Sequence, residues 1–255
     1  MSLKRREFLK VMGIAAAGAT VPFAFRFLAK GEAAQIIKTN KLRYVFLVDT
    51  KKCVGCGMCV RACKLENGIP YNAQVSRTWV ERYVEKKDGQ VLADSPMAGR
   101  DGFTSDKVEG QKVDPADIAK GFFVPKLCNQ CDKPPCVQVC PVGASFQMEN
   151  GIVLVNRKWC IGCGYCIMSC PYGARFFQPE KHVADKCTWC YHRLVKGLKP
   201  ACVQACPFGA RRIGNGMDPS DPVTRIITSE RVGVLKEQFG TKPQVYYIGL
   251  DKNVR

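Results

Sequence analysis

Cysteine spacing constrains this chain more than any other feature of its sequence. The sixteen cysteines form four groups of four with none left over: Cys53, Cys56, Cys59, Cys63; Cys128, Cys131, Cys136, Cys140; Cys160, Cys163, Cys166, Cys170; and Cys187, Cys190, Cys202, Cys206. The first and third groups have the spacing C-x2-C-x2-C-x3-C, a run that holds cubane [4Fe–4S] clusters through thiolates. At four thiolates per cluster, the count predicts four [4Fe–4S] clusters.

Two other uses of cysteine fit this pattern less well. A disulfide framework scatters cysteines so that they join distant loops, whereas here a two-residue spacing repeats. Structural zinc takes two C-x2-4-C pairs per site, which only the second and fourth groups could provide. Glycines between the ligands of the first and third groups instead allow the backbone to wrap closely around a cluster; they are Gly55, Gly57, Gly162 and Gly164.

The formal net charge of +17 overstates how basic the folded protein is. Residues 1–33 hold six basic and two acidic side chains, so +4 of this charge lies there and +13 in the rest. Four cubanes with thiolate ligands remove roughly 8 charges, at about −2 each when oxidised. The remaining balance argues against a nucleic-acid partner. Lysines next to the cysteine groups are either solvated loop charges or groups that raise cluster potentials; they are Lys51, Lys52, Lys158 and Lys186.

The N-terminus predicts export. Lys4-Arg5-Arg6-Glu7-Phe8-Leu9-Lys10 precedes a weakly apolar stretch from Val11 to Phe25, a pattern that resembles a twin-arginine signal. Pro22 and Arg26 make this stretch a poor membrane span. We expect residues 1–33 to direct a folded, cofactor-loaded protein to the periplasm or the outer face of the cytoplasmic membrane, with cleavage near Ala33 or retention as an anchor.

An internal repeat indicates how the chain is organised. Three groups continue alike, as Cys140-Pro-Val-Gly-Ala, Cys170-Pro-Tyr-Gly-Ala-Arg and Cys206-Pro-Phe-Gly-Ala-Arg, which indicates a duplicated half-module. With a strand expected near 151–155, residues 122–180 form a predicted inner ferredoxin-like module. Residues 42–121 plus 181–255 would form an outer one.

Outside the cysteine groups the pattern is less regular. Alternation predicts strands at 78–85 and 243–250. The Gly- and Asp-rich residues 93–120 are typical of a long inserted surface loop, which either binds a partner or is a tolerated insertion. No apolar stretch after Cys206 reaches membrane-spanning length.

At this point the motifs resemble a family. The segments Cys53–Asn67, Cys128–Pro141, and Lys186-Cys-Thr-Trp-Cys through Pro200–Pro207 are similar to those of four-cluster iron–sulfur subunits of the dimethyl-sulfoxide-reductase and polysulfide-reductase type. The similarity covers about residues 42–250. It implies an α+β fold with short strands and helices, in which two interlocked bacterial-ferredoxin-like modules are related by pseudo-twofold symmetry.

The resemblance also implies the ligand sets, in which fourth cysteines are exchanged between groups. Cys163, which some relatives replace, is present, so all four clusters are expected to be [4Fe–4S]. Cluster 1 would use Cys53, Cys56, Cys59 and Cys206; cluster 2 Cys128, Cys131, Cys136 and Cys170; cluster 3 Cys160, Cys163, Cys166 and Cys140; and cluster 4 Cys187, Cys190, Cys202 and Cys63.

What the resemblance implies about function is electron transfer within an anaerobic respiratory complex. A quinone-interacting membrane subunit would lie at one end and a catalytic subunit, often with molybdopterin, or a cytochrome at the other. A free soluble polyferredoxin is the alternative. A catalytic iron–sulfur enzyme would need a cluster with an open iron site and hence a three-cysteine set, which the count does not provide. His182, His192, Trp159 and Trp189 flank ligands, and packing roles suffice for them, although the tryptophans could also shield clusters from water.

Overall fold

One sheet joins the two ends of the described residues. In the computed structural model, which describes residues 42–254, strand β1 (Tyr44–Asp49) pairs antiparallel with β11 (Arg211–Asn215) and parallel with β13 (Val245–Ile248). Strand β12 (Val232–Gly233) completes the order β11-β1-β13-β12. The predicted export signal, residues 1–33, lies outside the described residues.

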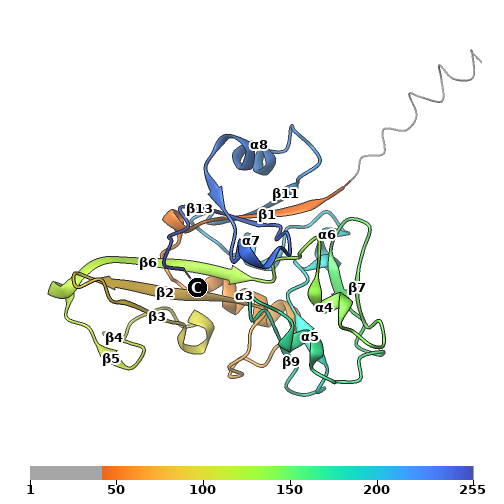
Figure 1. Cartoon of the computed structure of the whole chain (residues 1–255), viewed down its shortest axis with the longest axis horizontal. Coiled ribbons are helices and arrows are strands. Elements are labelled where there is room, and N and C mark those ends of the chain that lie inside the picture. Colours follow the sequence, from red (N-terminus) through yellow and green to blue (C-terminus); the bar gives the residue numbers. More distant parts are fainter. Residues whose placement is uncertain (1–41, 255) are drawn as a thin grey trace, which may run out of the picture. The chain divides into compact units, whose positions relative to one another are not determined.

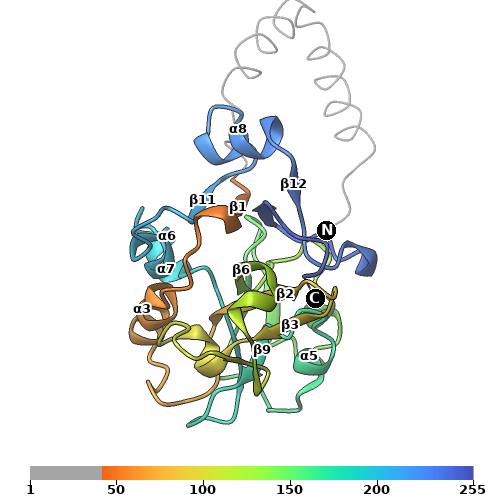
Figure 2. The same cartoon turned by 90° about the vertical axis from the view of Figure 1, so that its left-hand side faces the viewer.

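The faces of this sheet follow from the two-residue period of strand β1. Val45 and Leu47 face helix α8 (Pro222–Ser229), which lies over the sheet in Figures 1 and 2. Phe46 and Val48 face the main core on the other side. Helix α8 begins at Pro222 because the Asp221 carboxylate caps it by accepting hydrogen bonds from the next free backbone N–H groups.

A second sheet carries the region between the first two cysteine groups. Strand β2 (Thr78–Lys86) lies between β3 (Val91–Asp94) and the long strand β6 (Ile118–Leu127), antiparallel to both, with a register shift after Glu85. A small hairpin of β4 (Lys107–Val108) and β5 (Gln111–Lys112) follows β3. This hairpin is flanked by two short 3-10 helices, η3 (Pro96–Gly99) before it and η4 (Pro115–Asp117) after it. The described residues also contain the 3-10 helices η2 (Thr50–Lys52) and η5 (Glu237–Phe239).

The inserted residues are more ordered than a surface loop. Val108 and Val113, from the segment expected to be a loop, are buried against Val84 and Leu92 of the sheet, with Ile118 packed at the edge. The Gly- and Asp-rich composition hides this small core, because Val108, Val113 and Ile118 stand five residues apart among polar neighbours. The predicted strand at 78–85 is confirmed as β2, and the one at 243–250 contains β13.

The remaining elements are short and lie within or between the second, third and fourth cysteine groups. Two hairpins pair β7 (Ser145–Gln147) with β8 (Val153–Val155), and β9 (Arg175–Phe177) with β10 (Ala184–Lys186), so the strand expected near 151–155 is confirmed. Four helices have one turn each: α4 (Pro135–Gln138), α5 (Tyr165–Met168), α6 (Tyr191–Leu194) and α7 (Ala201–Gln204).

Proline explains why three of these helices stop so early. In α4, α5 and α7 the group's last cysteine precedes a proline, and a residue before proline is disfavoured in helical conformation. Cys63 is followed by Lys64 instead, so helix α3 (Met58–Asn67) continues for ten residues. It ends at Gly68, which caps it in the left-handed conformation at φ 61°.

Candidate iron–sulfur sites

Glycines with positive φ let the backbone turn tightly between the cysteines of the first and third groups. Gly57, at the N-terminus of α3, has φ 73°, and a Cβ placed on it would lie 2.2 Å from the backbone oxygen of Arg100. Gly164 occupies the same position before α5, also in the left-handed region at φ 80°. The predicted role of glycine in letting the backbone fold tightly here agrees with these conformations.

The structure brings the cysteines together across groups. One cavity is lined by Cys53, Cys56, Cys59 and Cys206, which we call quartet 1. A second is lined by Cys140, Cys160, Cys163 and Cys166, quartet 3. In both, three thiols come from one sequence group and the fourth from another.

The other two quartets are more deeply buried. Burial, and after it the neighbouring thiols Cys128, Cys136 and Cys170, raise the pKa of the Cys131 thiol to about 12. These four cysteines form quartet 2. Burial likewise raises the pKa of Cys63, next to Cys187, Cys202 and Cys190, which with Cys63 form quartet 4. Thiols clustered this way ionise together only if a cationic partner offsets the charge.

Backbone N–H groups point at several of these sulfurs. The amide of Ser145 donates to the Cys140 sulfur at 3.4 Å, and that of Ala210 to the Cys206 sulfur at 3.3 Å. Ser145 directly follows a Cys-Pro-x-Gly-Ala turn and Ala210 is the last residue of one, so the end of each turn provides an N–H donor to the cysteine that begins it. Although burial raises the pKa of Cys140, such N–H donors outweigh it and the pKa lies below its usual value.

The residues present fit a polynuclear cluster better than a single ion. Each quartet offers four sulfur donors and apolar surroundings. Within residues 42–254, no three His, Cys, Asp or Glu side chains converge closely enough to hold one metal ion. Ligands of a cubane lie farther apart than ligands of one zinc ion, because the iron and sulfide atoms occupy the space between them.

The quartets follow one another in space in an order that differs from the sequence. Cys202 of quartet 4 lies next to Cys59 of quartet 1, while Cys187 of quartet 4 interacts with Cys128 of quartet 2. Cys136 of quartet 2 and Cys166 of quartet 3 share one apolar cluster. The order is therefore 1–4–2–3, and quartets 1 and 3 are its two ends.

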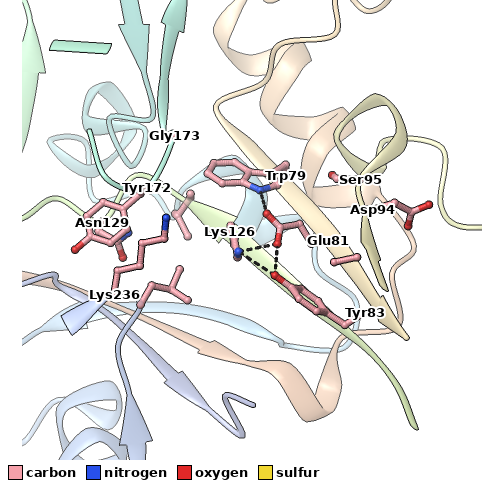
Figure 3. A pocket seen from close by; sticks show the side chains of 13 residues that line it. Trp79, Glu81, Tyr83, Asp94, Ser95, Lys126, Asn129, Tyr172, Gly173 and Lys236 are labelled. Carbon is pink, nitrogen blue, oxygen red and sulfur yellow. Dashed lines mark hydrogen bonds and ion pairs between the residues drawn. The ribbon is translucent and has the colours of Figure 1, made fainter. Parts of the chain in front are cut away.

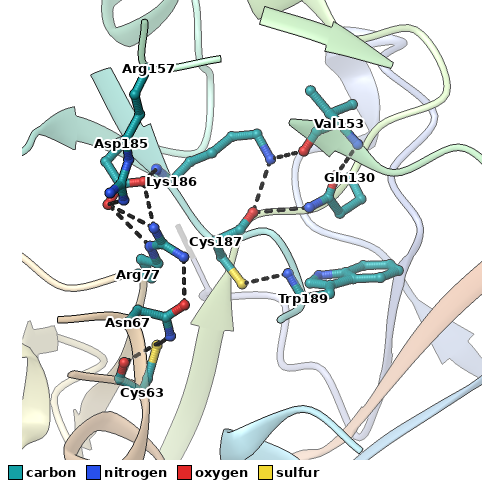
Figure 4. Close-up of polar contacts among 10 residues, drawn as sticks. All are labelled: Cys63, Asn67, Arg77, Gln130, Val153, Arg157, Asp185, Lys186, Cys187 and Trp189. Atoms are coloured by element: carbon teal, nitrogen blue, oxygen red, sulfur yellow. Dashed lines mark hydrogen bonds and ion pairs between the residues drawn. The ribbon is translucent and has the colours of Figure 1, made fainter. Parts of the chain in front are cut away.

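A buried polar network holds the middle of this series (Figure 4). Arg77 donates to both oxygens of Asp185, at 2.9–3.1 Å, and to Asn67, whose amide donates to the backbone oxygen and sulfur of Cys63. Lys186, fully buried, donates to the backbone oxygens of Val153 and Cys187. Lys186 is therefore not a solvated loop charge, whereas Lys51, Lys52 and Lys158 are exposed.

Of the histidines and tryptophans near the ligands, only Trp189 is deeply placed. Its indole N–H donates to the Cys128 backbone oxygen at 3.0 Å and its backbone N–H points to the Cys187 sulfur, so it separates quartets 4 and 2 from solvent. Trp159 is 60% exposed. His192 contacts Glu66 at the surface, which is a structural role.

A cavity of about 400 Å³ adjoins quartet 2 (Figure 3). On one wall the Glu81 carboxylate accepts hydrogen bonds from Trp79 at 2.7 Å and Tyr83 at 2.6 Å, and forms an ion pair with Lys126 at 2.6 Å. Across the cavity Lys236 donates to the backbone oxygen of Pro171. Glu81 and Lys126 thus balance each other's charge, while Lys236 is held by a backbone carbonyl.

Several residues around the quartets were not predicted from the sequence. Arg77, Asp185 and Asn67 give no local signal, because they meet only in the fold. Arg175 and Arg211 do give one, since both end a repeat of the form Cys-Pro-x-Gly-Ala-Arg, although the repeat alone does not indicate what they contact.

Comparison with known proteins agrees with this architecture. Two family models, both described as a 4Fe-4S dicluster domain, match residues 52–144 and 119–216. The sequence is 40% identical to the B subunit of tetrathionate reductase from Salmonella typhimurium, over 98% of this chain and 90% of the relative. It is 43% identical to the protein of the same name from Archaeoglobus fulgidus, over 83% and 84%, and 35% identical to the B component of polysulfide reductase from Wolinella succinogenes, over 81% and 94%.

The chain therefore belongs to the iron–sulfur electron-transfer subunits of the polysulfide-reductase type. It has a mixed helix and sheet fold with two ferredoxin-like 4Fe–4S domains, binds [4Fe–4S] clusters, and is not an enzyme on its own. No helix of the described residues is both long enough and apolar enough to cross a membrane.

Proposed function

We propose that this protein carries four [4Fe–4S] clusters and passes electrons through a membrane-associated, anaerobic respiratory reductase complex. We propose that the four quartets are the ligand sets and that clusters 1, 2, 3 and 4 bind in quartets 1, 2, 3 and 4, respectively. When bound, each cluster supplies a one-electron redox centre. The observation that carries the proposal is the series of four-thiol sites in the order 1–4–2–3, whose two end sites lie near the surface.

In this proposal the protein side chains hold, insulate and space the clusters. Apolar side chains and Trp189 exclude water from the middle of the series. The exchanged fourth cysteines would interlock an inner module, residues 122–180, and an outer module, residues 42–121 plus 181–255, with pseudo-twofold symmetry. The equivalent Cys-Pro-x-Gly-Ala turns at Cys170 and Cys206 support that symmetry.

Partner surfaces are proposed at the two ends. Around quartet 3, whose Cys163 is exposed, Ile161 is 66% and Met168 84% exposed. Around quartet 1, Val54 is 51% and Phe208 50% exposed. Apolar side chains beside an end cluster suit docking of another subunit. We propose a quinone-interacting membrane subunit at one end, and a catalytic, often molybdopterin-containing, or cytochrome subunit at the other.

The relatives' names favour a fixed subunit over a free polyferredoxin, since those relatives are components of reductases. Anaerobic purification of the complex from native membranes tests this directly. Co-elution of this protein with a membrane subunit is expected. Recovery of the loaded protein alone, in the soluble fraction, would support the free carrier.

The cluster content is tested by Cys163→Ala. Because Cys163 lies at the end of the series, we expect about four fewer iron atoms per protein molecule, or conversion of one cluster, with the other three clusters still reducible. Cys202→Ala, in interior quartet 4, should instead stop electron passage between the ends. Full iron content and unchanged spectra in both variants would contradict the ligand sets.

Location outside the cytoplasm is a separate proposal that the twin-arginine pattern supports. Replacing Arg5 and Arg6 with Lys should leave loaded protein in the cytoplasm, whereas Lys4→Arg should not. Immunoblots of fractionated cells give the answer, and normal export of the double variant would rule out this route.

A further inference from the structure

Two arginines hold equivalent positions in the internal repeat. Arg175 stands five residues after Cys170, and Arg211 five residues after Cys206, at the end of the Cys-Pro-x-Gly-Ala-Arg repeat. Each begins a strand, β9 or β11, and each is buried, at 4% and 2% exposure. A buried guanidinium stays charged, so both positions place a positive charge inside the protein.

Arg175 lies between quartets 2 and 3. One terminal nitrogen donates to the Cys136 sulfur of quartet 2 at 3.0 Å, and the other to the buried hydroxyl of Ser145 at 2.9 Å. Cys166 of quartet 3 shares an apolar cluster with Cys136 and lies on helix α5, which packs against β9. Arg175 thus reaches a ligand of one quartet while facing the other.

Arg211 repeats this arrangement between quartets 1 and 4. It lines the cavity of quartet 1, and one terminal nitrogen donates to the buried hydroxyl of Thr78 at 2.8 Å. Cys202 of quartet 4 lies on helix α7, which packs against β11 as α5 packs against β9. In both cases a hydroxyl anchors one side of the guanidinium and leaves the rest directed at cysteines.

Neither arginine has a carboxylate to balance its charge. Across residues 42–254, no Asp or Glu forms an ion pair with Arg175 or Arg211, and the buried Nε of Arg175 and Nη2 of Arg211 have no hydrogen-bond partner. The groups that surround each guanidinium are cysteines: Arg175 donates to the Cys136 sulfur at 3.0 Å, and Arg211 lines the cavity of quartet 1. The sulfur ligands are therefore the counter-ions.

We propose that Arg175 and Arg211 are shared counter-charges, each placed between two clusters, which raise the reduction potentials of clusters 2 and 3 and of clusters 1 and 4, respectively. Reduction adds one negative charge to a cluster, and a nearby buried cation stabilises that state more than the oxidised one. One arginine between two clusters therefore shifts both potentials in the same direction. The inference rests on the proposed four-cluster function.

The test is a redox titration of purified, anaerobic protein followed by electron paramagnetic resonance. Arg211→Met and Arg175→Met remove the charge and keep much of the side-chain volume. Arg175→Met is expected to lower the reduction potentials of clusters 2 and 3, and Arg211→Met those of clusters 1 and 4. The double variant should lower all four. We expect at least a tenfold shift in the reduced-to-oxidised ratio at fixed potential, which is about 59 mV for one electron.

Controls separate this effect from general disturbance. Arg212→Met changes the net charge equally on the same strand, where neighbouring residues face opposite sides, and should leave all four potentials in place. Arg211→Lys keeps the charge and should restore most of the shift. If Arg211→Met loses iron, the proposal is tested on Arg211→Lys instead. Its reduction potentials should then differ from wild type in the same two clusters, by a smaller amount.

The outcomes separate the two proposals. Wild-type protein without four titrating clusters would refute the proposed function. Four intact clusters in the wild type, with potentials that are unchanged in the arginine variants or displaced equally for all four clusters, would refute the shared counter-charge alone.

Discussion

Single residues hold distant parts of this protein together. Arg77 and Asp185, 108 residues apart, form a bidentate ion pair with side chains only 8% and 4% exposed. Arg157 also reaches Asp185, at 3.3 Å. Because Arg77 in turn donates to Asn67, whose amide donates to Cys63, this pair links strand β10 to quartet 4.

Asp185→Ala should therefore destabilise the loaded protein markedly. Removing one partner leaves the Arg77 charge buried, which costs about 3–5 kcal/mol. That corresponds to a fall of roughly 10 °C in the midpoint of thermal cluster loss, followed by visible absorbance.

A matched control is the surface pair of Lys112 and Asp106, whose side chains are 78% and 62% exposed and 3.8 Å apart. Asp106→Ala should lower the midpoint by no more than about 2 °C, since solvent and salt screen this pair. Equal midpoints for the two variants would show that the buried pair carries no special weight.

Helix α3 has a glycine with positive φ at each end, Gly57 and Gly68. The surroundings of the two glycines differ. Gly57 is crowded by the backbone of Gly99 and Arg100 from the insertion, whereas a Cβ on Gly68 would meet nothing within 4 Å. The insertion thus fixes where α3 starts, and with it the positions of Cys59 and Cys63.

Gly57→Ala and Gly68→Ala consequently form a matched pair. Both substitutions carry the left-handed penalty of roughly 1–2 kcal/mol, but only the first also forces backbone atoms apart. We expect Gly57→Ala to reduce iron content at quartets 1 and 4 and Gly68→Ala to retain it. Iron analysis of the two purified proteins decides, and full loading of Gly57→Ala would contradict the steric argument.

Across the whole molecule, the proposed clusters would act as cross-links. Helices of a single turn are not stable alone, and Cys53 and Cys206, which are far apart in the sequence, line one cavity that a cluster would fill. Iron removal by a chelator under reducing conditions should therefore expose most of the protein to protease, because cluster binding supplies folding free energy. The measurement is proteolysis of loaded and stripped protein side by side, and equal resistance would show that the fold stands without its clusters.

Local patterns in the sequence were sufficient to predict the cluster chemistry and the location of the main strands. Ligand spacing within a cysteine group is a local property, and so are the alternation in β2 and the proline after Cys140, Cys170 and Cys206 that ends each short helix. The cysteine count and these local patterns were enough to predict [4Fe–4S] binding, and the quoted motifs to indicate the family.

Four features became visible only in the folded chain. They are the spatial order of the quartets, the burial of Lys186, the small core of the insertion, and the position of Arg175 and Arg211 between pairs of sites. Each depends on contacts between residues far apart in the sequence, such as the pairing of β1 with β11 and β13. The spacing of residues along the sequence does not show which segments pack together. Packing depends on which arrangement buries the apolar faces and pairs the buried charges at the same time.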